Sequence, residues 1–314
     1  MSVTNRPRAI ALLSILLGFI VTALVILLFV LPDAPTAEKS EEGAAVATGG
    51  QPEDKPSAEA DGAGEDEGDL PSPSEETDGE KREPEETDLD RITPRYKIYL
   101  VVDDAGHDFR DIRPYLDLPF PLTVAILPDR EASRLTAEAV AASGKESILH
   151  LPMEPEGEVN PGAGAIYTSQ EGGEITELLL RHLEGTPGII GVNNHMGSRA
   201  TADIRVMGLV MEVLSERNLF FLDSRTSPDS VARRAAEERG VPFAERSVFL
   251  DNDRSGDAVA TQLAEAAAVA KEHGYAVAIG HVTSPVVAEV AASRAKALAE
   301  EGIAFAPLSE LFSP

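Results

Sequence analysis

The sequence predicts an α/β fold with a parallel sheet, an irregular (β/α) barrel of seven or eight repeats, over residues 93–314. Apolar runs typical of buried parallel strands alternate there with Ala-rich amphipathic stretches. Most of these stretches end at a Gly just before the next run, as helix C-caps do. Chemically versatile side chains follow several of the runs directly. A doubly wound open sheet is the alternative that the same alternation allows.

The expected strands are short and regularly spaced. They cover 98–102, 122–127, 147–151, 188–193, 219–223, 247–251, 275–280 and 303–307. The expected helices lie between them, at 129–143, 175–183, 203–217, 230–239, 257–273 and 285–300. Short connections between strand and helix imply right-handed crossovers and a parallel sheet.

Residues 1–32 are expected to form a cytoplasmic tip and a transmembrane anchor. Ala9–Leu31 is a run of 23 residues without charge, and as a helix it would span about 34 Å, enough for a bilayer core. Arg6 and Arg8 precede it and no acid does. This bias predicts a single-pass protein of the inner membrane whose C-terminal domain lies in the periplasm or outside the cell. A cleaved signal peptide is the alternative.

Residues 33–92 are expected to form a disordered acidic linker. Positions 33–90 hold 21 acidic and 4 basic residues and no aromatic residue, so this stretch cannot bury enough apolar surface to offset the entropy of ordering. An acidic tail that binds a partner is the alternative. The linker accounts for −17 of the net charge of −27 and leaves −12 for residues 91–314. We expect no nucleic-acid binding, which needs a basic patch.

Metal-binding and proton-transferring groups stand at the ends of four expected strands. Asp103 and Asp104, His150, His195 and His281 each follow an apolar run. The carboxyl ends of parallel strands meet at one edge of a sheet, so these side chains are expected to converge. Imidazole and carboxylate ligands without any Cys suit Zn²⁺ or another divalent ion. Since adjacent residues of a regular strand point to opposite faces, one Asp is expected to bind metal while the other does something else.

Further polar residues flank these positions. Asn193, Asn194, Ser198 and Arg199 form a dense cluster around His195. We expect them, like Arg225, either to bind substrate or water or to support the metal ligands. Asp223 and Arg225 follow another apolar run, where Asp223 is either an acid–base partner that orients a histidine or half of a structural ion pair. Glu154 is a direct ligand, a support for one, or a surface residue.

Six motifs together resemble the divergent polysaccharide deacetylase family, which is related to carbohydrate esterases with the chitooligosaccharide-deacetylase fold. They are V-V-D-D at 101–104, H-L-P-M-E-P at 150–155, N-N-H-M-G-S-R at 193–199, F-L-D-S-R-T at 221–226, F-L-D-N at 249–252 and I-G-H at 279–281. The resemblance covers residues 96–312. It implies an irregular (β/α)7 barrel that removes N- or O-acetyl groups from sugars.

The resemblance also implies roles for single residues. Asp103 would be the catalytic base, Asp104 and His150 metal ligands, and His281 the group that protonates the leaving group. Typical members carry H-x-x-x-H after the third strand, but here the fifth position is Glu154. Either Glu154 replaces the nitrogen ligand or His195 supplies it, and we favour His195. The family's Arg-Pro-Pro block is replaced by residues 193–199.

The expected protein is therefore a membrane-anchored, metal-dependent hydrolase that removes acetyl groups from an envelope or extracellular polysaccharide. Asp103, His281 and Asp223 would be its catalytic residues. The alternative is an inactive glycan-binding or envelope-assembly protein on the same scaffold, and a metal-dependent phosphoesterase is a third reading of the same ligands.

Overall fold

The computed structural model describes residues 94–313. The expected anchor (1–32) and linker (33–92) lie outside the described residues, so both stay predictions. Within residues 94–313, no helix is both long enough and apolar enough to cross a membrane.

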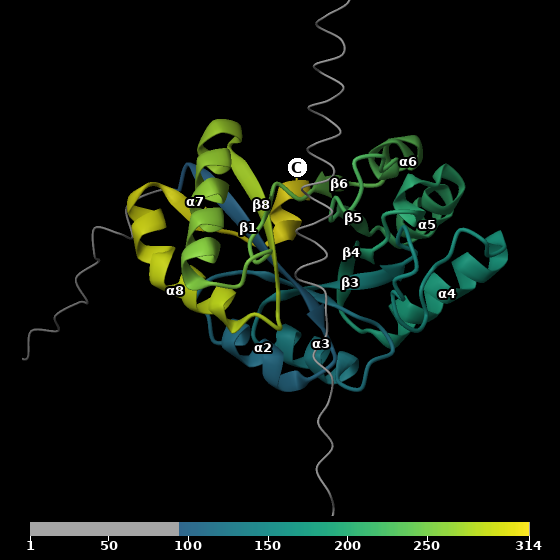
Figure 1. Ribbon diagram of the computed structural model, residues 1–314, viewed down its shortest axis with the longest axis horizontal. Coiled ribbons are helices and arrows are strands. Elements are labelled where there is room, and N and C mark those ends of the chain that lie inside the picture. The colour runs from purple at the N-terminus through teal and green to yellow at the C-terminus, as the bar shows by residue number, and fades with distance from the viewer. Residues whose placement is uncertain (1–93, 314) are drawn as a thin grey trace, which may run out of the picture. The chain divides into compact units, whose positions relative to one another are not determined.

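The described residues form one nine-stranded parallel sheet with helices around it (Figure 1). Its strands are β1 (Tyr96–Ala105), β2 (Thr123–Ile126), β3 (Glu146–Met153), β4 (Ile189–Met196), β5 (Phe220–Asp223), β6 (Phe243–Glu245), β7 (Val248–Phe249), β8 (Tyr275–His281) and β9 (Ile303–Phe305). The sheet order is β6-β5-β4-β3-β2-β1-β8-β7, and β9 pairs with β1. All pairings are parallel, as the alternation of apolar runs and helices predicts.

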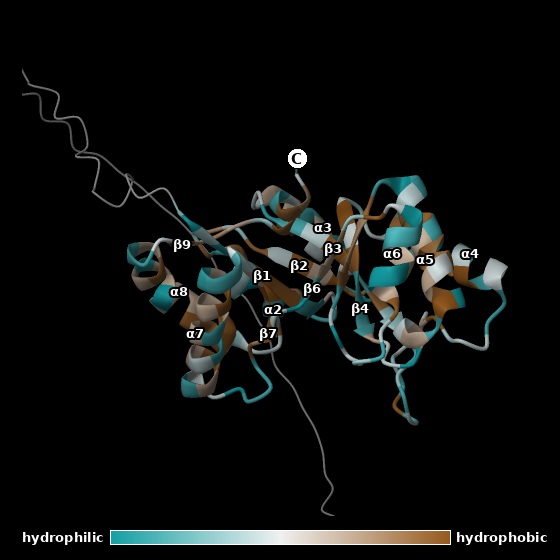
Figure 2. Cartoon of the chain, turned by 90° about the horizontal axis from the view of Figure 1, so that it is seen from above, coloured by the Kyte–Doolittle hydropathy of each residue, from teal (hydrophilic) through white to brown (hydrophobic). Residues whose placement is uncertain are grey.

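The helices are amphipathic and carry both hydrophobic and hydrophilic residues along their length (Figure 2). They are α2 (Phe109–Leu116), α3 (Ser133–Ala142), α4 (Gly172–Gly185), α5 (Ile204–Arg217), α6 (Ala232–Arg239), α7 (Gly256–His273) and α8 (Pro285–Glu300), with short 3₁₀ helices η2 (Ala200–Ala202) and η3 (Leu308–Phe312). The expected left-handed glycine caps are confirmed at Gly240 and Gly274, where φ is 67° and 90°.

The sheet curls, as an irregular barrel does, but its strand pairing does not close. Along the sheet order, β6 and β7 stand at opposite ends, although only two residues separate them in the chain. The Arg246 N–H donates to Asp223 O (3.0 Å) on β5, and the next N–H, of Ser247, donates to Val277 O (2.8 Å) on β8. One extended segment therefore leaves one edge of the sheet and joins the other without a helix between. The fold is a curled half-barrel.

The buried residues identify the inner and outer faces of this sheet. Residues on the outer face pack with the helices in two clusters, one around α2, α3, α7 and α8 and one around α4, α5 and α6. The inner face forms a third cluster that includes Val101, Ile148 and Ile279 and is closed by η3. The doubly wound alternative is therefore wrong, because it requires helices on both faces.

The strand positions that form the inner face of the sheet continue into the polar groups of the site. Val101, Ile148 and Ile279 each stand two residues before Asp103, His150 and His281, and side chains two apart share a face of a strand. His150 lies within β3, as expected, and β4 extends past the expected end at residue 193 to Met196, so that His195 also lies within a strand. β3 is longer than β2, and beyond the end of β2 it pairs with Ile166 instead. The Ile166 N–H donates to Pro152 O (2.9 Å).

Candidate metal centre

Asp103 and Asp104 both take part in the site, although adjacent strand residues normally face opposite sides. Asp104 has a φ of 65°, in the left-handed region that non-glycine residues rarely adopt. The pairing of β1 with β2 shifts register between Val102 and Ala105, across this residue. Our expectation of opposite faces is therefore wrong. Local backbone strain of this kind is concentrated at functional sites, where the surrounding structure maintains it.

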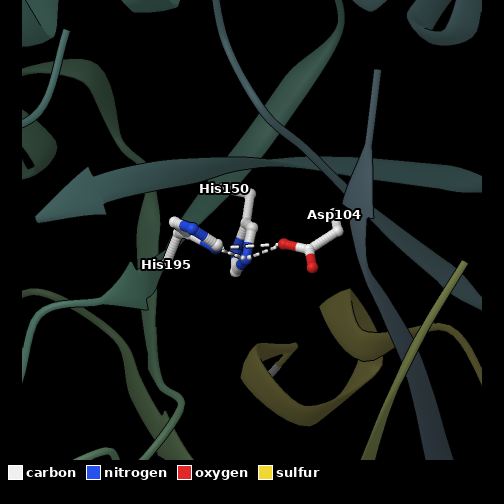
Figure 3. Close-up of side chains that lie close together, drawn as sticks. All are labelled: Asp104, His150 and His195. Carbon is white, nitrogen blue, oxygen red and sulfur yellow. Dashed lines mark hydrogen bonds and ion pairs between the residues drawn. The ribbon is translucent and has the colours of Figure 1, made fainter. Parts of the chain in front are cut away.

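Asp104, His150 and His195 form a compact triangle of potential ligand atoms (Figure 3). Asp104 Oδ1 lies 3.3 Å from His150 Nε2 and 3.0 Å from His195 Nδ1, and the two nitrogens are 3.1 Å apart. Asp104 Oδ1 is buried without a hydrogen-bond partner among the described residues. Three lone-pair donors thus face one point, which is costly unless a cation or a proton occupies it.

The triangle fits a divalent ion. Ligands about 2.0–2.1 Å from a tetrahedral ion lie about 3.3 Å from one another, and the three separations in the site are 3.0–3.3 Å. Two imidazoles and one carboxylate suit Zn²⁺, and other divalent transition metals accept the same set. The donor set therefore supports a metal centre without identifying the metal.

Asn193 connects His150 of the triangle to Asp103. The His150 ring donates its Nδ1–H to Asn193 Oδ1 (2.8 Å), which leaves His150 Nε2 free for a metal. The Asn193 amide donates to Asp103 Oδ1 (2.9 Å) and to Ser224 Oγ (3.2 Å). Asn193 is fully buried, so one side chain fixes the orientation of both His150 and Asp103.

Asp103 lies beside the triangle. Its Oδ2 is 3.8 Å from His150 Nε2, and only 3% of the residue is exposed. Burial raises the pKa of Asp103, although His150 and the Asn193 hydrogen bond oppose that shift. A carboxylate with a raised pKa accepts protons more readily, as a general base must.

His281 stands on the other side of Asp104 and is oriented by Asp251. Its Nδ1–H donates to Asp251 Oδ1 (3.1 Å), its backbone N–H donates to Asp251 Oδ2 (3.1 Å), and its Nε2 lies 3.8 Å from Asp104 Oδ2. Burial lowers the pKa of His281, but its hydrogen bond to Asp251 and the charge of Asp104 outweigh that effect, and the net shift is upward. This arrangement suits a proton donor.

The sequence assigned the histidine-orienting role to Asp223, and the structure assigns it to Asp251. The Asp223 carboxylate accepts from the Arg225 N–H (2.7 Å) and the Ser230 hydroxyl (2.6 Å). None of the histidine ion pairs in residues 94–313 involves Asp223. Both aspartates follow apolar runs, so strand-end position alone could not rank them. The deciding fact is that β7, which precedes Asp251, pairs with β8, which carries His281.

The electrostatics of the centre favour a positive charge. Burial alone would lower the pKa of His150, but Asp103 and Asp104 raise it to about 9. Burial would likewise raise the pKa of Asp104, but the adjacent imidazoles of His150 and His195 hold it well below its usual range. Without a metal, a proton on His150 supplies the charge. A divalent ion would replace that proton, because a metal ligand must be deprotonated.

Glu154 does not join the triangle and holds a loop instead. Its Oε2 accepts from the Thr168 N–H (2.7 Å) and hydroxyl (2.6 Å), and its backbone oxygen accepts from the Arg199 N–H (3.1 Å). The structure thus groups His195, not Glu154, with the other two ligands. Glu154 fastens the long segment between β3 and α4.

The remaining expected site residues also hold the loops around the centre. Ser198 Oγ accepts from the Glu156 N–H (2.8 Å), and Arg199 Nε lies 3.7 Å from Glu154 Oε1. Arg225 pairs with Glu245 (3.2 Å). The Asn194 amide donates to Met196 O (2.7 Å), and its Oδ1 accepts from the Ser224 N–H (2.9 Å). Asn194 is therefore a brace between the ends of β4 and β5.

Comparison with known proteins agrees with this architecture. Residues 100–312 match the family described as divergent polysaccharide deacetylase. The chain is similar to an uncharacterized protein of Haemophilus influenzae (35% identity over 185 residues, 59% of this chain and 66% of that protein). It is also similar to the uncharacterized protein YibQ of Escherichia coli K12 (34% over 185 residues, 59% and 58%). The matches span less than two thirds of either relative.

Among solved structures, the fold is similar to that of an uncharacterized protein of Agrobacterium tumefaciens C58. The TM-score is 0.66, the identity is 21%, and the match covers 71% of this chain and 94% of that one. At this identity the likeness concerns the fold alone.

Proposed function

We propose, since the chain belongs to the divergent polysaccharide deacetylase family, that it is a metal-dependent hydrolase that removes N- or O-linked acetyl groups from a polysaccharide. The observation that carries the proposal is the triangle of Asp104, His150 and His195, with its buried, unpartnered carboxylate oxygen. Asp103 and His281, to which we assign the roles of base and acid, each lie 3.8 Å from a member of the triangle.

The reaction adds water to an amide or ester and releases acetate and an amine or alcohol. Asp104, His150 and His195 would hold the ion, which as a Lewis acid polarises the acetyl carbonyl. Asp103 takes the proton from the attacking water. His281, held by Asp251, donates a proton to the leaving nitrogen or oxygen when the bond to the carbonyl carbon breaks. Asn193 keeps His150 and Asp103 in place throughout.

We further propose that the substrate is an envelope or extracellular glycan. The support is the expected anchor at residues 1–32, which would keep the domain at the outer side of the inner membrane. A flexible linker of the length expected for residues 33–92 has a coil dimension of about 40–45 Å, and like charges extend it further. The domain would therefore reach glycan close to the membrane while it stays attached.

Two measurements test the proposal together. Elemental analysis of the purified chain is expected to find one divalent ion per chain, and His150→Ala and His195→Ala are expected to lose it. Acetate release from acetylated glycans is expected for the wild type and not for either variant. Stoichiometric metal without acetate release from any acetylated glycan would leave a metal-binding protein and remove the reaction. Glycan binding that survives both substitutions would then favour the non-catalytic alternative.

A further inference from the structure

Arg130 stands at the rim of the proposed active site. It lies in the segment between β2 and α3, at the same edge of the sheet as Asp104. Two backbone hydrogen bonds flank it, from the Leu127 N–H to Ala105 O (2.8 Å) and from the Ala132 N–H to Gly106 O (2.9 Å). This segment is therefore fastened directly to the two residues that follow Asp104.

The guanidinium of Arg130 has no partner among residues 94–313. Its Nε is buried without a hydrogen bond, and none of the ion pairs of the described residues includes it. A buried donor without an acceptor is unfavourable, more so when it carries charge. Arg134, one turn along α3, is 74% exposed and paired with Glu138 (3.0 Å). Among the arginines of the described residues, Arg130 is the one with a buried side-chain nitrogen that lacks a hydrogen-bond partner.

Arg130 is flanked in the sequence by Asp129 and Glu131, and no ion pair of the described residues joins it to either of them. Asp129 has a φ of 53°, and its Oδ2 lies 3.2 Å from Nδ1 of the buried His182. His182 also bonds to Gly164 O through Nε2 (2.8 Å). Asp129 is therefore engaged with α4, and its carboxylate leaves Arg130 unneutralised.

The loop between β3 and α4 makes room for the guanidinium. A Cβ at Gly162 would stand 2.5 Å from Arg130 Nη2, so the guanidinium lies against the backbone of this residue. Gly162 has a φ of 98°, where side chains are strained. The loop thus packs on Arg130 without supplying an acceptor to it. Arg130 is partly buried, which leaves part of it open to a ligand.

We propose that Arg130 is a specificity-determining residue that binds an oxyanion, a carboxylate or a phosphate ester, carried by the glycan beside the acetyl group that reacts. The inference rests on the proposed function. A planar guanidinium matches the paired oxygens of carboxylate and phosphate better than any other side chain. The net charge of −12 over residues 91–314 opposes an anionic substrate only at long range, because salt screens charges beyond about 8 Å. Contact with one arginine is little screened.

The first experiment measures binding without catalysis. Glucuronate and N-acetylglucosamine 6-phosphate are titrated into the zinc-loaded full chain, with N-acetylglucosamine as the neutral probe, and the arginine Nε–H signals are followed by NMR. Anionic probes are expected to shift an Nε–H signal that is absent from Arg130→Gln, and to bind that variant about 10-fold or more weakly. Arg134→Gln is the matched control and is expected to bind as the wild type does. Equal binding by Arg130→Gln and the wild type would overturn the proposal.

The second experiment compares substrates. Acetylated oligosaccharides that bear a carboxylate, bear a phosphate or are neutral are supplied to the same proteins. Arg130→Gln is expected to lower kcat/KM for an anionic substrate about 10- to 100-fold and to change the neutral substrate less than twofold. Whether the wild type prefers the carboxylate or the phosphate substrate shows which of the two groups Arg130 binds. An equal loss on all three substrates would show a structural role, and Arg130→Lys, which keeps the charge, would then rescue nothing. Activity on no substrate refutes the proposed function, while the binding experiment still decides the role of Arg130.

Discussion

Asn193→Leu tests whether Asn193 orients a metal ligand, because the loss of metal affinity can be measured separately from the loss of stability. The side chain is fully buried and makes three hydrogen bonds, with His150 Nδ1 (2.8 Å), Asp103 Oδ1 (2.9 Å) and Ser224 Oγ (3.2 Å). Leu keeps a similar size but neither accepts nor donates. His150 and Asp103 would each lose a partner in a buried place.

The expected effect has two parts. Each buried group that is left unpaired costs about 1–3 kcal/mol, so two of them lower the free energy of unfolding by about 2–6 kcal/mol. Loss of the bond that orients a ligating histidine reduces metal affinity about 10- to 100-fold. The affinity loss follows because His150 Nδ1–H no longer fixes which ring nitrogen faces Asp104 Oδ1.

The assay is competition for Zn²⁺ with a chromogenic chelator, on protein whose folded state is checked by circular dichroism and urea unfolding. Ser224→Ala is the matched control, since it removes only the longest of the three bonds and is expected to keep its zinc affinity within about threefold of the wild type. Zinc affinity within twofold of the wild type in a folded Asn193→Leu protein would refute the reasoning, because Asn193 would then not orient a ligand.

Three further predictions concern the charges of the centre. With the metal removed by a chelator, protonation of His150 should stabilise the chain fully below pH 6.5 and progressively less as the pH rises through its folded pKa of about 9. The melting temperature should fall over that pH range, by about 2–4 °C for each kcal/mol of stability lost. An unchanged melting temperature would contradict the raised pKa. Asp251→Asn should lower kcat for acetate release about 10²- to 10⁴-fold with unchanged metal content, since it removes the carboxylate that orients His281; loss of the metal would instead show a structural role. Asp104→Asn should fold, because Asn tolerates a φ of 65°, yet elemental analysis should find no bound ion; Asp104→Ala should in addition lose about 1–2 kcal/mol of stability, and full metal occupancy in both variants would exclude Asp104 as a ligand.

The residues of the centre differ in how well the sequence predicted them. His150 and His281 were predictable because a period of two along an apolar strand continues into them. His195 was predictable as a replacement for the missing second histidine of the H-x-x-x-H pattern. Asp251 was a weaker candidate than Asp223 and was given no role, because its partner is chosen by the pairing of β7 with β8, which join segments about 30 residues apart.

The expected substrate residues show the limit of composition as a guide. The polar cluster of residues 193–199 predicted contacts with substrate or support of the metal ligands. In the structure the side chains of Asn194, Ser198 and Arg199 contact Met196, Glu156 and Glu154, and a role in substrate binding stays a prediction. A dense polar segment after a strand is equally compatible with a functional site and with side chains that only hold neighbouring loops together. The distinction needs the positions of the acceptors, and these come from other parts of the chain.

The sequence alone predicted eight of the nine strands, all but β6 (Phe243–Glu245), that the strands run parallel, and that acidic and imidazole groups stand at their carboxyl ends. These properties are local, since they follow from the spacing of apolar residues and from what each residue type can do chemically. Only the tertiary structure decided that the sheet curls without full closure, that Asp104 turns to share a face with Asp103, and that Asp251 orients His281. Those outcomes depend on contacts between distant segments, whose energies outweigh the preference of a single residue for regular strand geometry.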